Sequence, residues 1–138
     1  APDRVYKIGH ATSNDGIYWV KEDGVQILPD VLGVDECQAL PSVIWFGNQY
    51  HMVFCYRHVH GFREDPSKAY RIGYATSSDL SNWIRKDAAL NLDTKAGEWD
   101  ADMQCYPHLT VLAGRPYLLY NGNAFGRYGF GAAELILE

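Results

Sequence analysis

The sequence lacks the features that mark several protein classes. It has no apolar run near the roughly 18 residues that a membrane-spanning helix needs, and no basic-then-apolar signal peptide at its start. Its 12 lysines and arginines form no basic cluster and are outnumbered by 17 acidic residues, for a net charge of −5, which argues against nucleic acid as a partner. Phosphate-binding loops, dinucleotide-binding turns and nucleophile elbows are also missing. We therefore expect no membrane span, no nucleic acid and no cofactor.

Cysteine is scarce. The three cysteines, Cys37, Cys55 and Cys105, are an odd number and form no Cys-x-x-Cys pair, which excludes a complete disulfide framework. This pattern favours reduced, partly buried thiols and a cytoplasmic location. One disulfide with one free thiol is the alternative.

Repeats organise the 138 residues. Residues 8–23 read IGHATSNDGIYWVKED and residues 72–87 read IGYATSSDLSNWIRKD, at a constant offset. A second repeat relates residues 41–57 to residues 107–123, each with a proline, an apolar run, a turn and a tyrosine-rich run. A unit of about 60 residues with two-residue periodicity fits a four-stranded propeller blade.

The sequence therefore predicts an all-β fold, a partial β-propeller of about two to two-and-a-half four-stranded antiparallel blades. We expect one partial domain over residues 1–138. Residues 5–28 would supply the outer strands of one blade, residues 35–93 a complete blade, and residues 101–138 the inner strands of the next. Open ends of such a fragment favour a homo-oligomer, with a dimer preferred.

The first repeat contains a compact turn. In each copy an aspartate, Asp15 or Asp79, precedes a tryptophan, Trp19 or Trp83. The carboxylate can accept backbone N–H bonds within the turn, and the indole can pack back onto the strands. We interpret these four residues as structural rather than ligand-binding.

The repeats resemble the five-bladed β-propeller glycosidases, which include invertases, levansucrases, arabinanases and mannoside phosphorylases. The resemblance rests on YRIGYATSSDLSNW, on DECQALPSVIW with QYHMVFCYR, and on DADMQCYPHL with PYLLYNGNAFGRYGFGAAEL. It implies a glycoside hydrolase or phosphorylase that acts on or binds a carbohydrate in a central funnel. The chain has under half the length of such a five-bladed protein, and the first-blade motif Trp-Met-Asn-Asp-Pro-Asn-Gly is absent.

Two carboxylates carry the catalytic hypothesis. Glycoside hydrolysis needs a general acid and a second carboxyl group. Glu36-Cys37 resembles the Glu-Cys motif of invertase-type enzymes, which makes Glu36 the candidate general acid. Asp102, at the start of the next blade, is the candidate second carboxylate, as a pKa modulator or transition-state stabiliser. The alternative for both is a solvated acid in a connection between blades.

Further polar and aromatic residues are candidate sugar ligands. Aromatic rings stack on pyranose rings, amides pair with hydroxyl groups, and an arginine can fork onto a sugar oxygen. The candidates are Arg57, Tyr106, His108, Asn121 and Asn123. Their alternatives are a salt bridge for the arginine, blade packing for the tyrosine and turn formation for the asparagines.

Two other motifs are given structural interpretations. Residues 62–66 resemble the Arg-Asp-Pro motif of invertases with a glutamate inserted, but they lie between the second and third strands of a blade and not on an inner strand, so we expect an exposed charged loop. His58 and His60 have the spacing of zinc ligands, but no third ligand accompanies them, so we expect no metal. The remaining alternative for the whole chain is a non-catalytic binding module or orphan propeller fragment that has lost catalysis.

Overall fold

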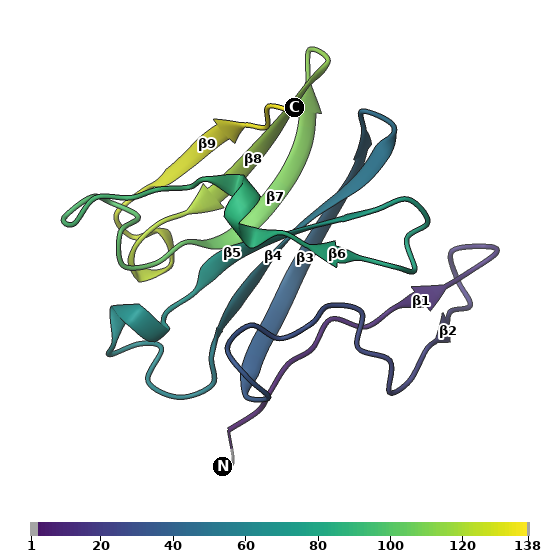
Figure 1. Cartoon of the computed structure of the whole chain (residues 1–138), viewed down its shortest axis with the longest axis horizontal. Helices are drawn as coiled ribbons and strands as arrows, with labels where there is room; N and C mark the ends of the chain where they lie inside the picture. The colour runs from purple at the N-terminus through teal and green to yellow at the C-terminus, as the bar shows by residue number, and fades with distance from the viewer. Residues whose placement is uncertain (1–2, 138) are drawn as a thin grey trace.

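The computed structural model describes residues 3–137 and is built from three antiparallel sheets. The first sheet pairs β1 (Ala11–Thr12) with β2 (Val20–Lys21). The second contains β3 (Glu36–Phe46), β4 (Gln49–His58), β5 (Arg71–Ser77) and β6 (Ile84–Arg85). The third contains β7 (Cys105–Leu112), β8 (Arg115–Asn121) and β9 (Phe130–Glu134). The predicted all-β fold of partial propeller blades is confirmed (Figure 1).

Helix is limited to three short 3-10 turns in the described residues. They are η1 (Pro66–Lys68), η2 (Asp87–Leu90) and η3 (Ala124–Gly126). No helix in residues 3–137 has the length and hydropathy needed to cross a membrane.

Each long hairpin is closed by a two-residue turn with positive φ at both positions. Gly47 and Asn48 have φ of 56° and 62° between β3 and β4, and Ala113 and Gly114 have φ of 49° and 77° between β7 and β8. Such turns follow the right-handed twist of paired strands. The two copies of the second repeat therefore form equivalent hairpins.

Each innermost strand also contains a bulge at the same place in the repeat. The pairing of β3 with β4 shifts after Ala39, and the pairing of β7 with β8 shifts after Cys105. The residues at these shifts, Leu40 and Tyr106, have φ of 56° and 54°, and a proline follows each. Because a bulge breaks the regular alternation, it redirects a side chain. Leu40 and Tyr106 are 48% and 46% exposed.

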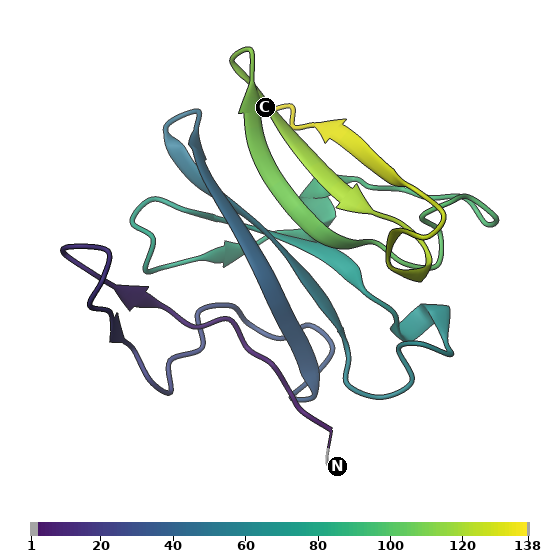
Figure 2. The same cartoon turned by 180° about the vertical axis from the view of Figure 1, so that it is seen from behind.

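The second sheet lies between the other two (Figure 2). On one side, Met52, Phe54 and Ala75 pack with Ile8 and Leu28 from the N-terminal region. On the other side, a second cluster joins it to the third sheet; its members are Val53, Ile72, Tyr74, Leu109, Leu118 and Tyr120.

Strand β7 is joined directly to both β3 and β4. The Leu109 amide donates to Ser42 Oγ over 2.9 Å, and the Tyr106 amide donates to Cys55 Sγ over 3.1 Å. All three cysteines are free and buried, and burial raises the pKa of the Cys55 thiol to about 12 and that of the Cys105 thiol to about 11. The thiols of Cys55 and Cys105 are therefore protonated and pack at the contact between the second and third sheets.

Candidate functional site

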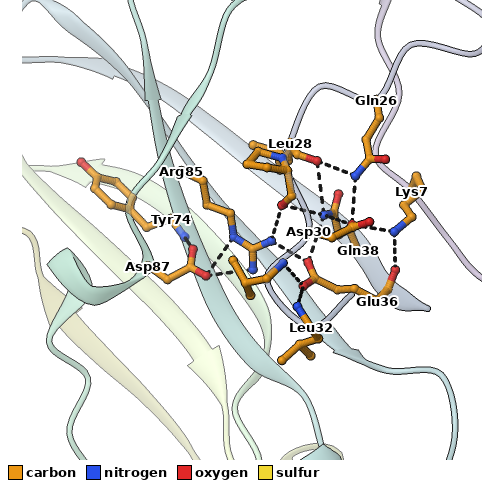
Figure 3. A network of polar contacts seen from close by, with 12 residues as sticks. Lys7, Gln26, Leu28, Asp30, Leu32, Glu36, Gln38, Tyr74, Arg85 and Asp87 are labelled. Carbon is orange, nitrogen blue, oxygen red and sulfur yellow. Dashed lines mark hydrogen bonds and ion pairs between the residues drawn. The ribbon is translucent and has the colours of Figure 1, made fainter. Parts of the chain in front are cut away.

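Glu36 lies at the first residue of β3 and its carboxylate is enclosed by donors (Figure 3). The residue is 0% exposed. Its Oε1 accepts from the Arg85 guanidinium and from Gln38 Nε2, and its Oε2 accepts from the backbone amides of Val31 and Leu32 at 2.7 and 2.8 Å. The carboxylate therefore has a bonded donor on each oxygen before any ligand arrives.

The electrostatics of this site favour the ionised form. Burial by itself raises the pKa of Glu36, but the hydrogen bonds from Arg85, Gln38 and the two amides outweigh it and hold the pKa below its ordinary value. A general acid must carry a proton at the working pH. The catalytic role of Glu36 stays a prediction, and this geometry makes departure of Arg85 its precondition.

Arg85, on β6, bonds several groups besides Glu36. Its guanidinium also bonds Asp87 Oδ2 at 2.8–2.9 Å and the carbonyl of Pro29 at 2.6 Å, and it stacks over the ring of Tyr56. Burial lowers the pKa of Arg85, but Asp87 and Glu36 outweigh this effect and raise it. The network therefore ties β3 and β6 of the second sheet to the loop that follows the first sheet.

Asp102 has a different environment. Its backbone is held on both sides, because its N–H donates to Asn123 Oδ1 over 2.9 Å and its carbonyl accepts from Arg71 Nη1 over 2.8 Å. Its carboxylate is exposed and makes no hydrogen bond or ion pair with any residue in the described range. Asp102 is thus a positioned carboxylate that is open to a ligand.

The two predicted carboxylates have different neighbours. Glu36 pairs with His58 and Cys37 pairs with Arg57 across the β3–β4 ladder. Because side chains alternate along strands, Glu36 points to the face opposite Arg57. The Glu36 carboxylate is bonded by the loop after the first sheet through the Val31 and Leu32 amides, whereas Asp102 is held through its backbone by Arg71 and Asn123.

The asparagine amides hold the loop that carries Asp102. Asn123 Oδ1 accepts from the amides of Asp102 and Met103, and its Nδ2 donates to the carbonyl of Glu98 over 3.0 Å. Asn121 Nδ2 donates to the carbonyl of Phe125 over 3.4 Å. Contact between these amides and a sugar stays a prediction, and their observed bonds position neighbouring loops.

Tyr106 and His108 are both exposed side chains of β7. Around the Tyr106 bulge the rings form a chain, with centroids of Tyr106 and Phe125 at 6.3 Å, Phe125 and Tyr70 at 6.2 Å, and Tyr70 and Phe62 at 5.8 Å. We call these four residues the aromatic row. The sequence analysis singled out Tyr106 alone.

Arg57 lies at the far end of this row. Its guanidinium carbon is 3.7 Å from the ring centroid of Phe62 and 5.3 Å from that of Tyr70. The salt bridge considered as its alternative role is not found among residues 3–137. The structure thus places Tyr106 and Arg57 at the two ends of the aromatic row, and the Glu36 side chain points to the opposite face of the second sheet from Arg57.

The row could have been found in part from the sequence. Phe62 lies in the segment interpreted as an exposed charged loop, yet it is only half-exposed because Arg57 and Tyr70 pack against it. Its signal was an aromatic residue inside an otherwise charged loop. Within residues 3–137, no group of three or more histidine, cysteine, aspartate or glutamate side chains is arranged to hold a metal ion.

Comparison with curated proteins shows two similar chains, and no family model matches the sequence. Both are described as uncharacterized proteins of Mycobacterium tuberculosis: MT1551 of strain CDC 1551 / Oshkosh and Rv1502 of strain ATCC 25618 / H37Rv. Each is 36% identical to this chain over 129 residues, or 93% of this chain. The chain spans 40% of the length of these relatives.

Solved structures share the fold. One, described as a glycoside hydrolase, aligns with 93% of this chain and 35% of its own at a TM-score of 0.63 and 21% identity. Another, described as a BT0996 RGII complex, aligns with 93% of this chain and 34% of its own at a TM-score of 0.61 and 20% identity. The protein therefore has a glycoside hydrolase-like fold.

Proposed function

We propose that this chain forms part of a carbohydrate-binding β-propeller and that the sugar binds over the aromatic row. The observation that carries the proposal is Tyr106, a half-exposed ring on a positive-φ bulge of an innermost strand. Bulges are concentrated beside binding sites because they redirect side chains. The glycoside hydrolase-like fold supports the same conclusion by analogy.

The chemistry around Tyr106 suits a sugar. The ring offers an apolar face for the C–H groups of a pyranose, and His108 is an exposed side chain of the same strand. We expect His108 and the open carboxylate of Asp102 to be the partners for hydroxyl groups. Few polar groups beside an aromatic surface are typical of small-ligand sites.

Glycan-array binding tests the proposal. The chain should bind a subset of glycans, and Tyr106→Ala should weaken that binding about tenfold or more, since loss of stacking removes roughly 1–2 kcal/mol. Tyr128→Ala, at another exposed tyrosine, is the matched control and should leave binding unchanged. Equal effects of the two substitutions, or no glycan bound at all, would refute the site.

A second candidate function is cleavage of a glycosidic bond, by hydrolysis or by phosphorolysis. It is favoured by the open carboxylate of Asp102 and requires Glu36 to act as general acid after Arg85 moves away. Turnover of nitrophenyl glycosides with and without phosphate, abolished in Glu36→Gln and in Asp102→Asn, would establish it. Glycan binding without turnover would identify a binding module that has lost catalysis.

We also propose that the chain associates with itself, with a dimer favoured. The support is the exposed apolar surface at the two ends of the sheet series, which soluble monomers seldom leave wet. It includes Ile17, Tyr18 and Val20 at the N-terminal end and Phe130 and Ile136 at the C-terminal end. Sedimentation that shows a stable 15.6 kDa species at micromolar concentration would overturn this proposal.

A further inference from the structure

Arg57 is a buried cation without a counter-charge among the described residues. It is 5% exposed, and Nη1 donates to the carbonyls of His58 and Val59 at 2.8 and 3.3 Å. Its Nε is buried and has no hydrogen-bond partner. Native proteins usually satisfy such groups or pair them with a carboxylate.

A second arginine lies against the same ring. The guanidinium carbon of Arg63 is 4.3 Å from the ring centroid of Phe62, where that of Arg57 is 3.7 Å away. Neither arginine forms an ion pair within residues 3–137. Phe62 therefore contacts two positively charged side chains at the end of the aromatic row.

Two nearby carboxylates are engaged elsewhere. Asp65 accepts from Ser67 and pairs with Lys68 at 3.5 Å, and Asp3 pairs with His60 at 2.8 Å. Glu64, the residue after Arg63, is exposed and forms no ion pair with either arginine. Two like charges held close together destabilise each other unless an anion is shared between them.

We propose that Arg57 and Arg63 form an oxyanion subsite for a charged group on the bound sugar. The guanidinium fork matches a carboxylate, phosphate or sulfate in two parallel hydrogen bonds, and Nη2 of Arg57 has no bond to a described residue. The subsite lies at the Phe62 end of the aromatic row, so one acidic saccharide can stack along the row and place its anion there. This inference rests on the proposed function and specifies its substrate class.

The test compares acidic and neutral glycans on the same array. Its arms are uronic acid oligosaccharides, sulfated and phosphorylated glycans, and the neutral counterparts of each. We expect at least one acidic class to bind about tenfold more tightly than its neutral counterpart, the effect of one charge-assisted pair. Inorganic phosphate serves as a competitor that carries the anion without the sugar.

Three variants locate the effect. Arg63→Gln changes an exposed residue, so it should fold normally and should weaken acidic glycans about fivefold or more while leaving neutral ones unchanged. Arg57→Lys keeps the buried charge but loses the fork, and should weaken the same glycans. Arg127→Gln is the matched control, because Arg127 is likewise exposed and lies 5.8 Å from the ring of Tyr128.

The outcomes separate this inference from the proposed function. Equal binding of acidic and neutral glycans, with Arg63→Gln behaving like Arg127→Gln, would overturn the oxyanion subsite and leave the carbohydrate site standing. Loss of neutral and acidic binding together in Arg63→Gln would also overturn it, because a charge-selective contact affects the acidic class alone. Absence of any glycan binding would overturn both.

Discussion

The two copies of the first repeat form the same turn in two different sheets. In both copies one aspartate, Asp15 or Asp79, accepts two backbone amides within the turn, at 2.8–2.9 Å. The indole N–H of Trp19 or Trp83 then donates to a carbonyl three residues earlier. These backbone bonds lower the pKa of both aspartates. Local residues are therefore sufficient to form this turn.

Burial differs between the same two copies. Ala75 and Thr76 on β5 are buried, whereas their counterparts Ala11 and Thr12 on β1 are not. Trp19 is 60% exposed, while Trp83 packs against the cluster around Phe54. The second copy has β3 and β4 beside it, and the first sheet contains two short strands alone. Burial in a blade thus comes from the inner hairpin rather than from the repeat itself.

The largest expected difference in the free energy of unfolding is between variants of Arg85 and of its repeat counterpart, Lys21. Arg85→Ala leaves the buried Glu36 carboxylate without its main counter-charge, so the free energy of unfolding should fall by about 3–5 kcal/mol. Lys21→Ala removes an exposed side chain and should change it by less than about 0.5 kcal/mol. Urea denaturation of both variants measures the difference. A loss below about 1 kcal/mol for Arg85→Ala would show that the hydrogen bonds of Arg85 contribute little to stability.

The ion pair of Glu36 with Arg85 predicts that the folded state loses stability in acid. Because the folded-state pKa of Glu36 lies below its ordinary value of 4.5, the pair contributes stability that is fully present above pH 4.5. This contribution is lost as the pH falls through the lowered folded-state pKa. Glu36→Gln should remove that part of the pH dependence, which urea denaturation at a series of pH values detects. An identical acid profile in the variant would contradict the assignment.

The second contrast is between the tryptophans of the two turns. Trp83→Ala removes a partly buried indole and should destabilise by about 2–3 kcal/mol, somewhat less than a fully buried tryptophan. Trp19→Ala, at the exposed copy, should cost less than about 1 kcal/mol. Thermal and urea unfolding of the pair provide the measurement, and equal losses would mean that the turn alone stabilises the indole.

Short-range features of the molecule could be predicted from the sequence, and long-range contacts could not. The repeats predicted the sheets and the turns, because periodicity and turn residues act over short stretches of chain. They did not predict that Arg85, far from Glu36 in the sequence, forms an ion pair with its carboxylate. They also missed Phe62 and Phe125 in the aromatic row, since a ring in a loop has no periodicity to mark it. Contacts between residues far apart in the chain depend on packing that the sequence pattern does not encode.

The smallest contrast concerns two equivalent glycines, Gly9 and Gly73. A Cβ on Gly73 would lie 2.3–2.9 Å from ring atoms of Phe54, whereas a Cβ on Gly9 would meet nothing within 4 Å. Because Phe54 is fully buried and cannot move freely, Gly73→Ala should destabilise by about 1–3 kcal/mol. Gly9→Ala should change the free energy of unfolding by about 0.5 kcal/mol or less.

A double substitution identifies the cause of the Gly73 effect. Phe54→Leu shortens the ring to a smaller side chain, so in that background Gly73→Ala should cost less than it does alone. The same comparison at Gly9 has no such partner, because no inner strand covers it in the first sheet. Additive losses for Phe54→Leu and Gly73→Ala would show that the glycine is needed for its backbone and not for the space above it. Reduced loss in the double variant would establish that the inner hairpin, by placing an aromatic ring over the strand, is what makes one copy of the repeat a buried blade.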